Sequence, residues 1–375
     1  MREINFAVLG TGFIGKVHTY AIKSLPFYYE GLPFRVKLKG VCSRTLQSAV
    51  TAKENYGFEF AADSLDDIFS RDDIDAVSIC LPNYQHKECV LKAIEKGLAI
   101  YCEKPLAANA EEAEEIKRAL EGRKIVNRIV FQNRFFACVL RAKKLIEGGK
   151  LGRILSFRAC YQHPGNVDKS IFNWKFEKEF CGGGVLFDMG SHALDMLYYL
   201  LGEFKSVSAK MQTAYTQRVD QRGAIRQVEV EDAAYLIAEM KDGSSGTIQV
   251  SKIAAGSNDD FKVEIYGEKG VLRFDLMDPN WVGFYDNTAP EGPFGGDRGF
   301  LKIESVQRYP KPGGSFPSPK LAGGWLRAHI HSMYEFLSCV YEGRPGKPDL
   351  ADGAYIQYVM QKAYESDKAG RRIGL

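Results

Sequence analysis

Short apolar runs alternate with amphipathic helical patterns through the first 130 residues, and this alternation limits the possible folds more than any other feature. The runs are nearly continuous in apolar residues, which is typical of strands covered on both faces. Strand–helix alternation of this kind predicts a parallel, doubly wound sheet. The predicted strands cover residues 4–10, 36–43, 76–82, 98–105 and 125–133, and the predicted helices cover about 12–24, 45–57, 86–97 and 110–120.

The pattern changes after about residue 130. Later runs alternate apolar and polar residues and are joined by turns, which predicts antiparallel sheet with one covered face. We therefore expect an α/β protein with a doubly wound domain at 1–130, followed by an α+β domain at 131–375 built on a large, mainly antiparallel, open-faced sheet. In the second domain we predict strands at 154–163, 207–213, 233–240, 246–252, 261–267 and 270–276, helices at 139–147, 326–341 and 351–369, and a long loop at 288–324.

Composition excludes several other classes of protein. The 375 residues carry 50 basic and 47 acidic side chains, a formal net charge of +3, so the charge does not predict nucleic-acid binding. No stretch approaches the roughly 20 apolar residues that a membrane helix needs, and the N-terminal residues do not resemble a signal peptide. No cysteine or histidine spacing indicates a metal site. We expect a cytoplasmic protein that binds neither nucleic acid nor membrane.

The strongest motif is the glycine pattern Gly10-Thr11-Gly12-Phe13-Ile14-Gly15. It follows a predicted strand directly and opens a helix, which is the context that identifies a dinucleotide-binding turn. The first glycine permits the tight turn, the second lets the backbone approach a pyrophosphate, and the third lets the helix and the strand pack closely. The pattern predicts a Rossmann-type site for NAD or NADP; the alternative is a plain glycine-rich turn.

The end of the second predicted strand bears on the choice of cofactor. An acid there would bind the ribose 2′-hydroxyl of NAD, but the chain has Ser43 and Arg44. Arg44 can pair with a 2′-phosphate through charge-assisted hydrogen bonds, so the pattern favours NADP. A solvated surface arginine is the alternative, and Glu30 lies in a predicted loop at 26–33.

Two further strand ends are expected on the ligand side, because ligands of open α/β sheets bind outside the carboxyl ends of the strands. One carries Leu81, Pro82 and Asn83, followed by His86, which we favour as a residue on the helix surface over a cofactor contact. The other carries Glu103 and Lys104 before Pro105. Proline restricts the preceding residue to extended conformations, so the direction in which the Lys104 side chain leaves the backbone is limited. The ammonium of such a lysine can stabilise an alkoxide or polarise a carbonyl.

A second constellation runs from Gly182 to Asp195. Three glycines, which would let the backbone lie against a flat ligand, precede a predicted helix on which Asp188 and His192 are four residues apart and share a face. A carboxylate beside an imidazole orients it and stabilises its protonated form, and Asp195 is also within reach of His192 by its spacing. The alternative to a catalytic pair is that Asp188 caps the helix N-terminus and His192 is a buried core residue.

These motifs, in this order and spacing, resemble the large family of glucose–fructose oxidoreductase, inositol dehydrogenase and rhizopine-catabolism proteins, the Gfo/Idh/MocA family. The resemblance covers nearly the whole chain, including LIEGGKLGRI at 145–154. It implies a Rossmann domain followed by a substrate-binding and oligomerisation domain, with NAD(P) held between them and dimers or tetramers formed through the outer sheet face. The family's catalytic lysine, aspartate and histidine fall on Lys104, Asp188 and His192. Segments that often face the substrate in such proteins contain Arg134, Tyr161, His163, Trp174 and Lys175.

The predicted reaction is hydride transfer between nicotinamide C4 and a secondary alcohol or ketone carbon of a sugar or polyol. His192 would exchange the hydroxyl proton, Lys104 would hold the reacting oxygen, and Asp188 would orient the substrate or His192. Two rivals remain open. One is a glycoside-cleaving enzyme that uses NAD as a tightly held redox catalyst, and the other is a non-catalytic sugar sensor, which would be expected to lack the lysine or the histidine.

Overall fold

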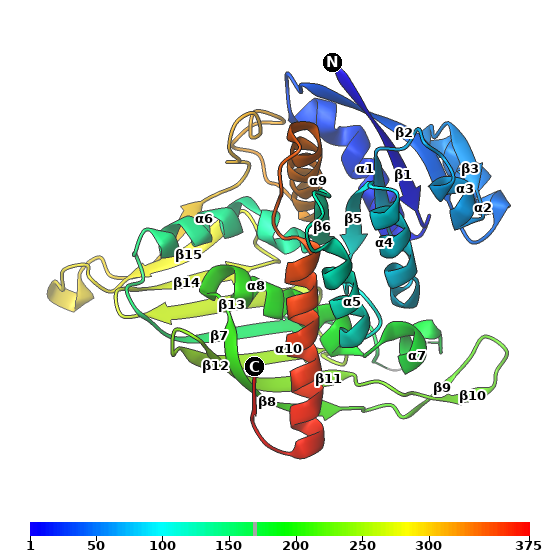
Figure 1. Ribbon diagram of the computed structural model, residues 1–375. Helices are drawn as coiled ribbons and strands as arrows, with labels where there is room; N and C mark the ends of the chain where they lie inside the picture. The colour runs from blue at the N-terminus through cyan, green and yellow to red at the C-terminus, as the bar shows by residue number, and fades with distance from the viewer. Residues whose placement is uncertain (168–170) are drawn as a thin grey trace. The chain divides into compact units, whose positions relative to one another are not determined.

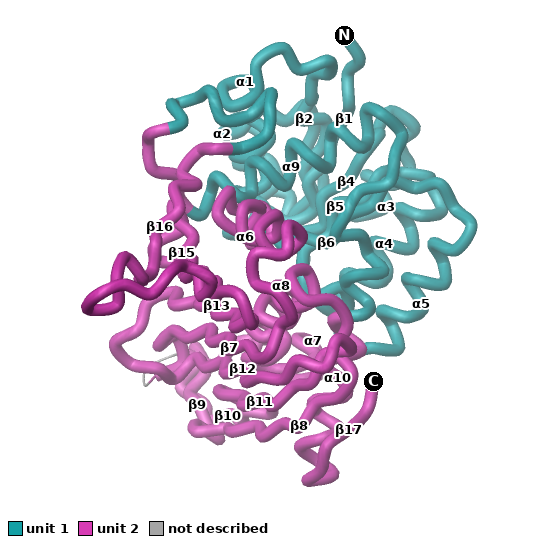
Figure 2. The backbone as a smooth tube through the Cα atoms, turned by 90° about the vertical axis from the view of Figure 1, so that its left-hand side faces the viewer, with its two compact units in different colours: residues 1–132, 309–319, 325–355 teal, residues 133–308, 320–324, 356–375 magenta. Residues whose placement is uncertain are grey.

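The computed structural model describes residues 1–167 and 171–375. The chain divides into two compact units, coloured separately in Figure 2. Unit 1 comprises residues 1–132, 309–319 and 325–355, and unit 2 comprises residues 133–308, 320–324 and 356–375. The first unit therefore includes segments from the C-terminal part of the chain in addition to the predicted doubly wound region.

Unit 1 is built on a parallel sheet, as the strand–helix alternation predicts. Among the described residues the sheet has six strands in the order β3-β2-β1-β4-β5-β6, and every pairing is parallel. This is the strand order of a Rossmann dinucleotide-binding sheet. The strands are β1 (Arg2–Leu9), β2 (Phe34–Cys42), β3 (Phe60–Ala62), β4 (Ala76–Ile79), β5 (Ala99–Glu103) and β6 (Asn127–Val130).

Two helices of unit 1, α2 and α5, begin at residues whose side chains cap the helix. Thr45 accepts a hydrogen bond from the Ser48 N–H at the start of α2, and Gly57 ends that helix in the left-handed region. Asn109 caps α5, accepting from the Glu112 N–H at 2.8 Å. The elements are α1 (Phe13–Tyr28), α2 (Leu46–Tyr56), α3 (Leu65–Phe69), η1 (Asn83–Gln85), α4 (His86–Glu95), α5 (Ala110–Leu120), η2 (Gln132–Phe135, which continues into unit 2) and α9 (Trp325–Glu342).

The core of unit 1 joins the start of the chain to α9. Phe6, on β1, packs edge-on against Phe336 of α9, with ring centroids 6.4 Å apart. Met333 and Leu337 lie in the same buried cluster. Helices α1 and α9 also pack against each other. A helix far along the sequence thus completes the hydrophobic core of the Rossmann sheet.

Unit 2 is built on a mixed, mainly antiparallel sheet. In the described part of the chain it has nine strands, in the order β16-β15-β14-β13-β7-β12-β11-β8-β17, and β12 pairs with β7 in parallel. The strands are β7 (Ile154–Gln162), β8 (Phe204–Gln212), β11 (Ala233–Met240), β12 (Ser245–Ser251), β13 (Asp260–Gly267), β14 (Gly270–Asp275), β15 (Trp281–Asp286), β16 (Phe300–Glu304) and β17 (Ile373–Gly374), with β9 (Gln217–Val219) and β10 (Ile225–Gln227) forming a separate hairpin.

Helices cover one face of this sheet (Figure 1), where α6 packs on β14 and β15, and η4 and α8 pack on β7 and its neighbours. The strands alternate accordingly, with Ala238 buried and Ile237 64% exposed on β11. The remaining elements are α6 (Ala137–Glu147), η3 (Trp174–Phe176), α7 (Lys178–Cys181), η4 (Leu186–Gly190), α8 (Ser191–Leu201), η5 (Pro293–Gly295) and α10 (Leu350–Ala369), whose first residues belong to unit 1.

Some predicted boundaries are wrong. Helix α1 runs on to Tyr28 with Pro26 inside it, so the predicted loop at 26–33 is shorter, and Glu30 comes after the helix. The predicted loop at 288–324 contains η5 and strand β16. Strands β3 and β15 and helix α3 were not expected, since they are short or lack a clear apolar period. Within residues 1–167 and 171–375, no helix is long and apolar enough to cross a membrane.

Candidate cofactor and substrate sites

The glycine motif forms the turn between β1 and α1 in unit 1. Gly10 has φ +106°, and a Cβ there would lie 2.4 Å from the Cys80 carbonyl oxygen. At Gly15 a Cβ would lie 1.9 Å from the Gly10 carbonyl oxygen. Both positions therefore exclude any larger residue, one for its backbone conformation and both for close packing.

Gly12 differs from its two neighbours in the motif. Apart from Gly12 itself, its chain neighbours and the backbone of its own helix, no heavy atom of the described residues lies within 4 Å of the position that its Cβ would take. It is the N-cap of α1, where no side chain caps the helix and no acidic residue stands in the first turn. The open space and the uncapped N–H groups fit a dinucleotide pyrophosphate, which helix N-termini favour through hydrogen bonds and the helix dipole.

The side chains that follow Gly12 extend this surface. Phe13 is 74% exposed and stacks on Trp325 of α9, with ring centroids 5.8 Å apart. Ile14 is partly buried against the core of the unit. The backbone of the motif and a ring from α9 therefore lie side by side in unit 1.

Ser43 and Arg44 lie at the end of β2, as predicted. The Ser43 hydroxyl is 2.8 Å from the Thr11 hydroxyl, and its N–H donates to the Ala62 carbonyl oxygen. Ser43 is thus held against the glycine motif, whereas Arg44 is exposed. The arrangement leaves the guanidinium accessible to a ligand at this strand end.

The turn after β4 carries Leu81, Pro82 and Asn83. His86 is 1% exposed, so the expectation of a helix-surface residue is wrong. Its ring nitrogens lie 2.8 Å from the carbonyl oxygens of Leu81 and Pro105. His86 therefore ties together the two strand ends that were expected on the ligand side.

Glu103 is the last residue of β5, and Lys104 follows it directly. Glu103 is buried, and its carboxylate accepts from the Lys104 N–H at 3.2 Å and lies 3.0 Å from Nε2 of His18. The other ring nitrogen of His18 is 2.7 Å from the Ser78 hydroxyl. Burial opposes protonation of His18, but the Cys80 and Glu103 side chains outweigh burial and raise its pKa to about 10. This network fixes the backbone of Lys104, whose side chain is half-buried.

In unit 2 the glycine run before η4 packs against the protein itself. A Cβ at Gly184 would lie 2.1 Å from the Glu231 carbonyl oxygen, and one at Gly183 would lie 2.3 Å from the Tyr364 hydroxyl. Glu231 accepts from the N–H groups of Gly184 and Leu186. These glycines are therefore required by close packing on Glu231 and Tyr364. Gly184 also lines the pocket beside the run, and contact of the run with a ligand stays a prediction.

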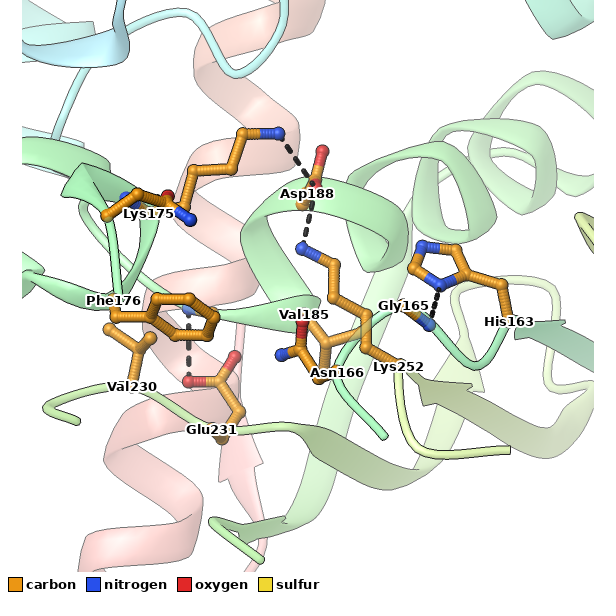
Figure 3. A pocket seen from close by; sticks show the side chains of 12 residues that line it. His163, Gly165, Asn166, Lys175, Phe176, Val185, Asp188, Val230, Glu231 and Lys252 are labelled. Atoms are coloured by element: carbon orange, nitrogen blue, oxygen red, sulfur yellow. Dashed lines mark hydrogen bonds and ion pairs between the residues drawn. The ribbon is translucent and has the colours of Figure 1, made fainter. Parts of the chain in front are cut away.

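A pocket of about 240 Å³ opens beside this segment (Figure 3). Asp188 reaches into it from η4, and its Oδ2 lies 2.6 Å from Nζ of Lys252 and 3.8 Å from Nζ of Lys175. The lining is rich in hydrogen-bonding groups, which suits a small polar ligand. It comprises His163, Gly165, Asn166, Asn173, Lys175, Phe176, Gly184, Val185, Asp188, Val230, Glu231 and Lys252.

His163 lines the pocket as the sequence suggested. Its Nδ1 accepts from the Gly165 N–H at 2.9 Å, and burial, helped by the positive charge of Lys252, lowers the pKa of its ring. Trp174 stands between the lining residues Asn173 and Lys175, and the Lys175 ammonium lies 5.9 Å from its ring centroid.

His192 is the second residue of helix α8. It is 6% exposed, and its ring centroid lies 6.1 Å from that of Tyr161. Burial, and then the charge of Asp259, raise the pKa of Tyr161 well above its usual range. Tyr161 is therefore protonated at neutral pH, and as a proton acceptor it is inferior to the neighbouring imidazole.

Arg134 and Asp195 pair with each other. The Arg134 Nε and Nη2 groups donate to the Asp195 carboxylate at 2.5–3.1 Å, and both residues are buried. The structure pairs Asp195 with Arg134, and a contact of Asp195 with His192 stays a prediction. The guanidinium of Arg134, expected to face a substrate, is already bound inside the unit.

Sequence reasoning missed Lys252 and Glu231, since neither belongs to a recognisable motif. Each follows or precedes a strand of the sheet, and only the fold brings it beside Asp188 or the glycine run. Of the three predicted catalytic residues, Asp188 and His192 belong to unit 2 and Lys104 belongs to unit 1.

A Rossmann unit with an open glycine turn, together with a sheet unit that holds a polar pocket, defines an oxidoreductase that binds a nicotinamide dinucleotide. Two family models match the chain: the oxidoreductase family with an NAD-binding Rossmann fold at residues 4–130, and the GFO/IDH/MocA C-terminal domain at residues 139–273. The chain belongs to the Gfo/Idh/MocA family of NAD-dependent oxidoreductases.

Individual relatives resemble it over nearly its full length. Levoglucosan dehydrogenase of Pseudarthrobacter phenanthrenivorans is 31% identical, with 98% of this chain and 96% of the relative covered. The structure of a levoglucosan dehydrogenase in complex with NADH and levoglucosan matches with a TM-score of 0.95 and 30% identity, over 100% of this chain and 99% of the other. An NAD binding oxidoreductase from Klebsiella pneumoniae matches with a TM-score of 0.93 and 26% identity, over 100% and 99% of the chains.

Proposed function

We propose that the chain catalyses hydride transfer between a secondary alcohol or ketone carbon of a sugar or polyol and a nicotinamide dinucleotide. The observation that carries the proposal is the pocket of unit 2, where Asp188 is presented among amide, imidazole and ammonium groups. Such a lining matches a ligand with many hydroxyls. The similarity to a dehydrogenase solved with levoglucosan, and also with L-sorbose, supports the same substrate class.

The nicotinamide, when bound, supplies the hydride acceptor or donor. The protein supplies position and proton transfer. His192 takes the proton of the reacting hydroxyl as the general base and returns it in the reverse direction. Lys104 stabilises the negative charge that develops on the reacting oxygen. Asp188 orients the substrate from the pocket wall, where Lys252 holds its Oδ2 at 2.6 Å.

The test is a screen of purified protein with NAD or NADP against sugars and polyols, following absorbance at the nicotinamide band. Levoglucosan, L-sorbose, inositols and sugar phosphates make up the first panel. Substrate-dependent appearance or loss of the reduced cofactor is expected. Glycoside cleavage without net change in the reduced cofactor would overturn the proposal in favour of a redox glycosidase, and sugar binding without any turnover would indicate a sensor.

For the cofactor we propose that Arg44 and Ser43 hold the ribose 2′-phosphate of NADP. The end of β2 has an accessible arginine, and Ser43 is fixed beside the glycine motif by Thr11. NADH is the cofactor in the related dehydrogenase complexes. Titration of both dinucleotides into the protein decides between the two, with tighter binding of NADP(H) expected.

We also propose a homo-dimer or homo-tetramer assembled through the face of the unit 2 sheet opposite the one on which α6 and α8 pack. Tyr235 and Ile237 on β11 are 41% and 64% exposed there. Light scattering after size exclusion should give a mass of two or four chains, and a monomer would contradict this. We also propose that the protein is located in the cytoplasm, where nicotinamide cofactors are available.

A further inference from the structure

Lys252 lies directly after β12, at a place where its backbone is fixed on both sides. Its N–H donates to the Asp232 carbonyl oxygen at 2.8 Å, and its carbonyl oxygen accepts from the Asn166 N–H at 2.8 Å. Asp232 is itself buried and accepts from the Asn166 side chain at 2.8 Å. The Lys252 side chain therefore starts from a rigid point of the sheet rather than from a mobile loop.

The Lys252 side chain points at Asp188 (Figure 3). Nζ lies 2.6 Å from Oδ2, and the side chain is 11% exposed. Lys175 approaches the same oxygen only to 3.8 Å and is 54% exposed. The Asp188 side chain is 36% exposed, so its pair with Lys252 is partly buried. Because exposed ion pairs contribute little, the close and mostly buried Lys252 ammonium holds Asp188 more strongly than the exposed Lys175 ammonium does.

The other carboxylate of the pocket does not compete for Lys252. Glu231 is bound to the Gly184 and Leu186 N–H groups and to the Tyr364 hydroxyl, and burial raises its pKa. The mostly buried Lys252 ammonium therefore pairs with the carboxylate of Asp188 rather than with that of Glu231.

We propose that Lys252 is a positioning residue of the oxidoreductase, holding the Asp188 carboxylate in the orientation that the reaction uses. The proposal rests on the function proposed above. Asp188 is in η4, and His192 follows on α8 in the same continuous helical segment. An ion pair that anchors Asp188 to β12 also anchors the turn that leads to His192, so its loss should affect turnover more than cofactor binding.

The experiment compares Lys252→Met, Lys252→Arg, Asp188→Asn and the Lys252→Met/Asp188→Asn double variant. The matched control is Lys302→Met, because Lys302 makes an exposed ion pair of the same 2.6 Å length with Asp278 and neither residue lines the pocket. It measures kcat and KM for the best sugar or polyol, the Kd of the dinucleotide by calorimetry, and thermal unfolding. We expect Lys252→Met to lower kcat by about 10²-fold, as small misplacements of catalytic groups do, with the dinucleotide Kd unchanged. Lys252→Arg should recover most of the loss, and Lys302→Met should change kcat by less than about 3-fold.

The effect of the double variant on kcat shows whether Lys252 acts through Asp188. If Lys252 acts through Asp188, Lys252→Met should add little to Asp188→Asn. Independent, multiplying effects would overturn the proposal, as would a rise in KM alone, which would indicate direct substrate contact. Failure of the proposed function appears separately, as a wild-type protein that turns over no sugar or polyol. In that case the melting temperatures still test the pair, since additive losses in the double variant would show that Lys252 and Asp188 are uncoupled.

Discussion

The glycine turn of unit 1 and the pocket of unit 2 are built in different ways. The turn uses six consecutive residues, Gly10–Gly15, and depends on what the backbone can do: Gly10 has φ +106°, and Gly15 has no room for a Cβ. The pocket uses side chains separated by almost ninety positions, from His163 to Lys252, which the sheet brings together. A site made from local backbone is visible as a motif, whereas a site made from converging side chains is visible only in the fold.

The glycines of the two regions show the same contrast. Gly12 has nothing within 4 Å of its missing Cβ, whereas a Cβ at Gly184 would meet the Glu231 carbonyl oxygen at 2.1 Å. One glycine leaves room for a ligand, and the other is required by the protein's own packing. Both stand in glycine-rich runs before a helix, so the sequence alone does not distinguish them.

The largest expected effects are on catalysis and come from one residue of each unit. Lys104→Ala and His192→Ala should each lower kcat, by about 10²–10³-fold for a lost electrostatic stabiliser and about 10²–10⁴-fold for a lost general base. The dinucleotide Kd should stay near that of the wild type. The double variant should fall short of the product of the single effects if both residues serve one oxygen. Near-native turnover of His192→Ala would reject it as the base.

Substitution of the two glycines tests the contrast directly. Gly12→Val should abolish dinucleotide binding in calorimetry and leave thermal unfolding nearly unchanged, because the branched side chain fills space that the pyrophosphate needs. Gly184→Ala should lower stability by about 1–3 kcal/mol, the usual cost of overpacking, through its clash with the Glu231 backbone. If Gly12→Val still binds the dinucleotide, Gly12 does not leave room for a ligand. If Gly184→Ala is as stable as the wild type, Gly184 is not required by the packing of unit 2.

Much of unit 1 could be predicted because its signals are local. Apolar runs predicted the parallel strands other than β3, and the glycine pattern identified the turn between β1 and α1. Residues that act across the fold were mistaken or missed. His86 was expected on a helix surface, since its two backbone partners, Leu81 and Pro105, cannot be inferred from spacing. Lys252 likewise has no signal of its own, because its partner is 64 positions away.

Cofactor preference gives a smaller effect, confined to unit 1. Arg44→Ala should weaken NADP(H) binding by about 10-fold, the order expected for a lost charge-assisted pair, and should leave NAD(H) binding nearly unchanged. Ser43→Ala provides the companion variant, since Ser43 is held by Thr11. Equal weakening of both cofactors by Arg44→Ala would show that the guanidinium does not bind the 2′-phosphate.

The smallest expected effect concerns the buried network behind Lys104. Cys80 and Glu103 raise the pKa of His18 from 6.5 to about 10 against the opposing effect of burial. A histidine whose pKa is higher in the folded than in the unfolded protein stabilises the fold fully below the unfolded pKa, and that contribution is lost as the pH rises through the folded pKa. The stability that His18 contributes should therefore be complete below about pH 6.5 and vanish by about pH 10.

His18→Asn removes this contribution. The melting temperature of the variant should fall below that of the wild type near pH 6, by about 2–4 °C for each kcal/mol that the raised pKa contributes in a unit of this size. The difference should narrow as the pH approaches 10, where the wild-type ring also loses its proton. Comparing the two proteins at each pH cancels the titration of groups that they share. A difference that stays constant with pH would mean that His18 is neutral in the folded protein and contributes through packing alone, against Tyr101 at a ring distance of 5.0 Å.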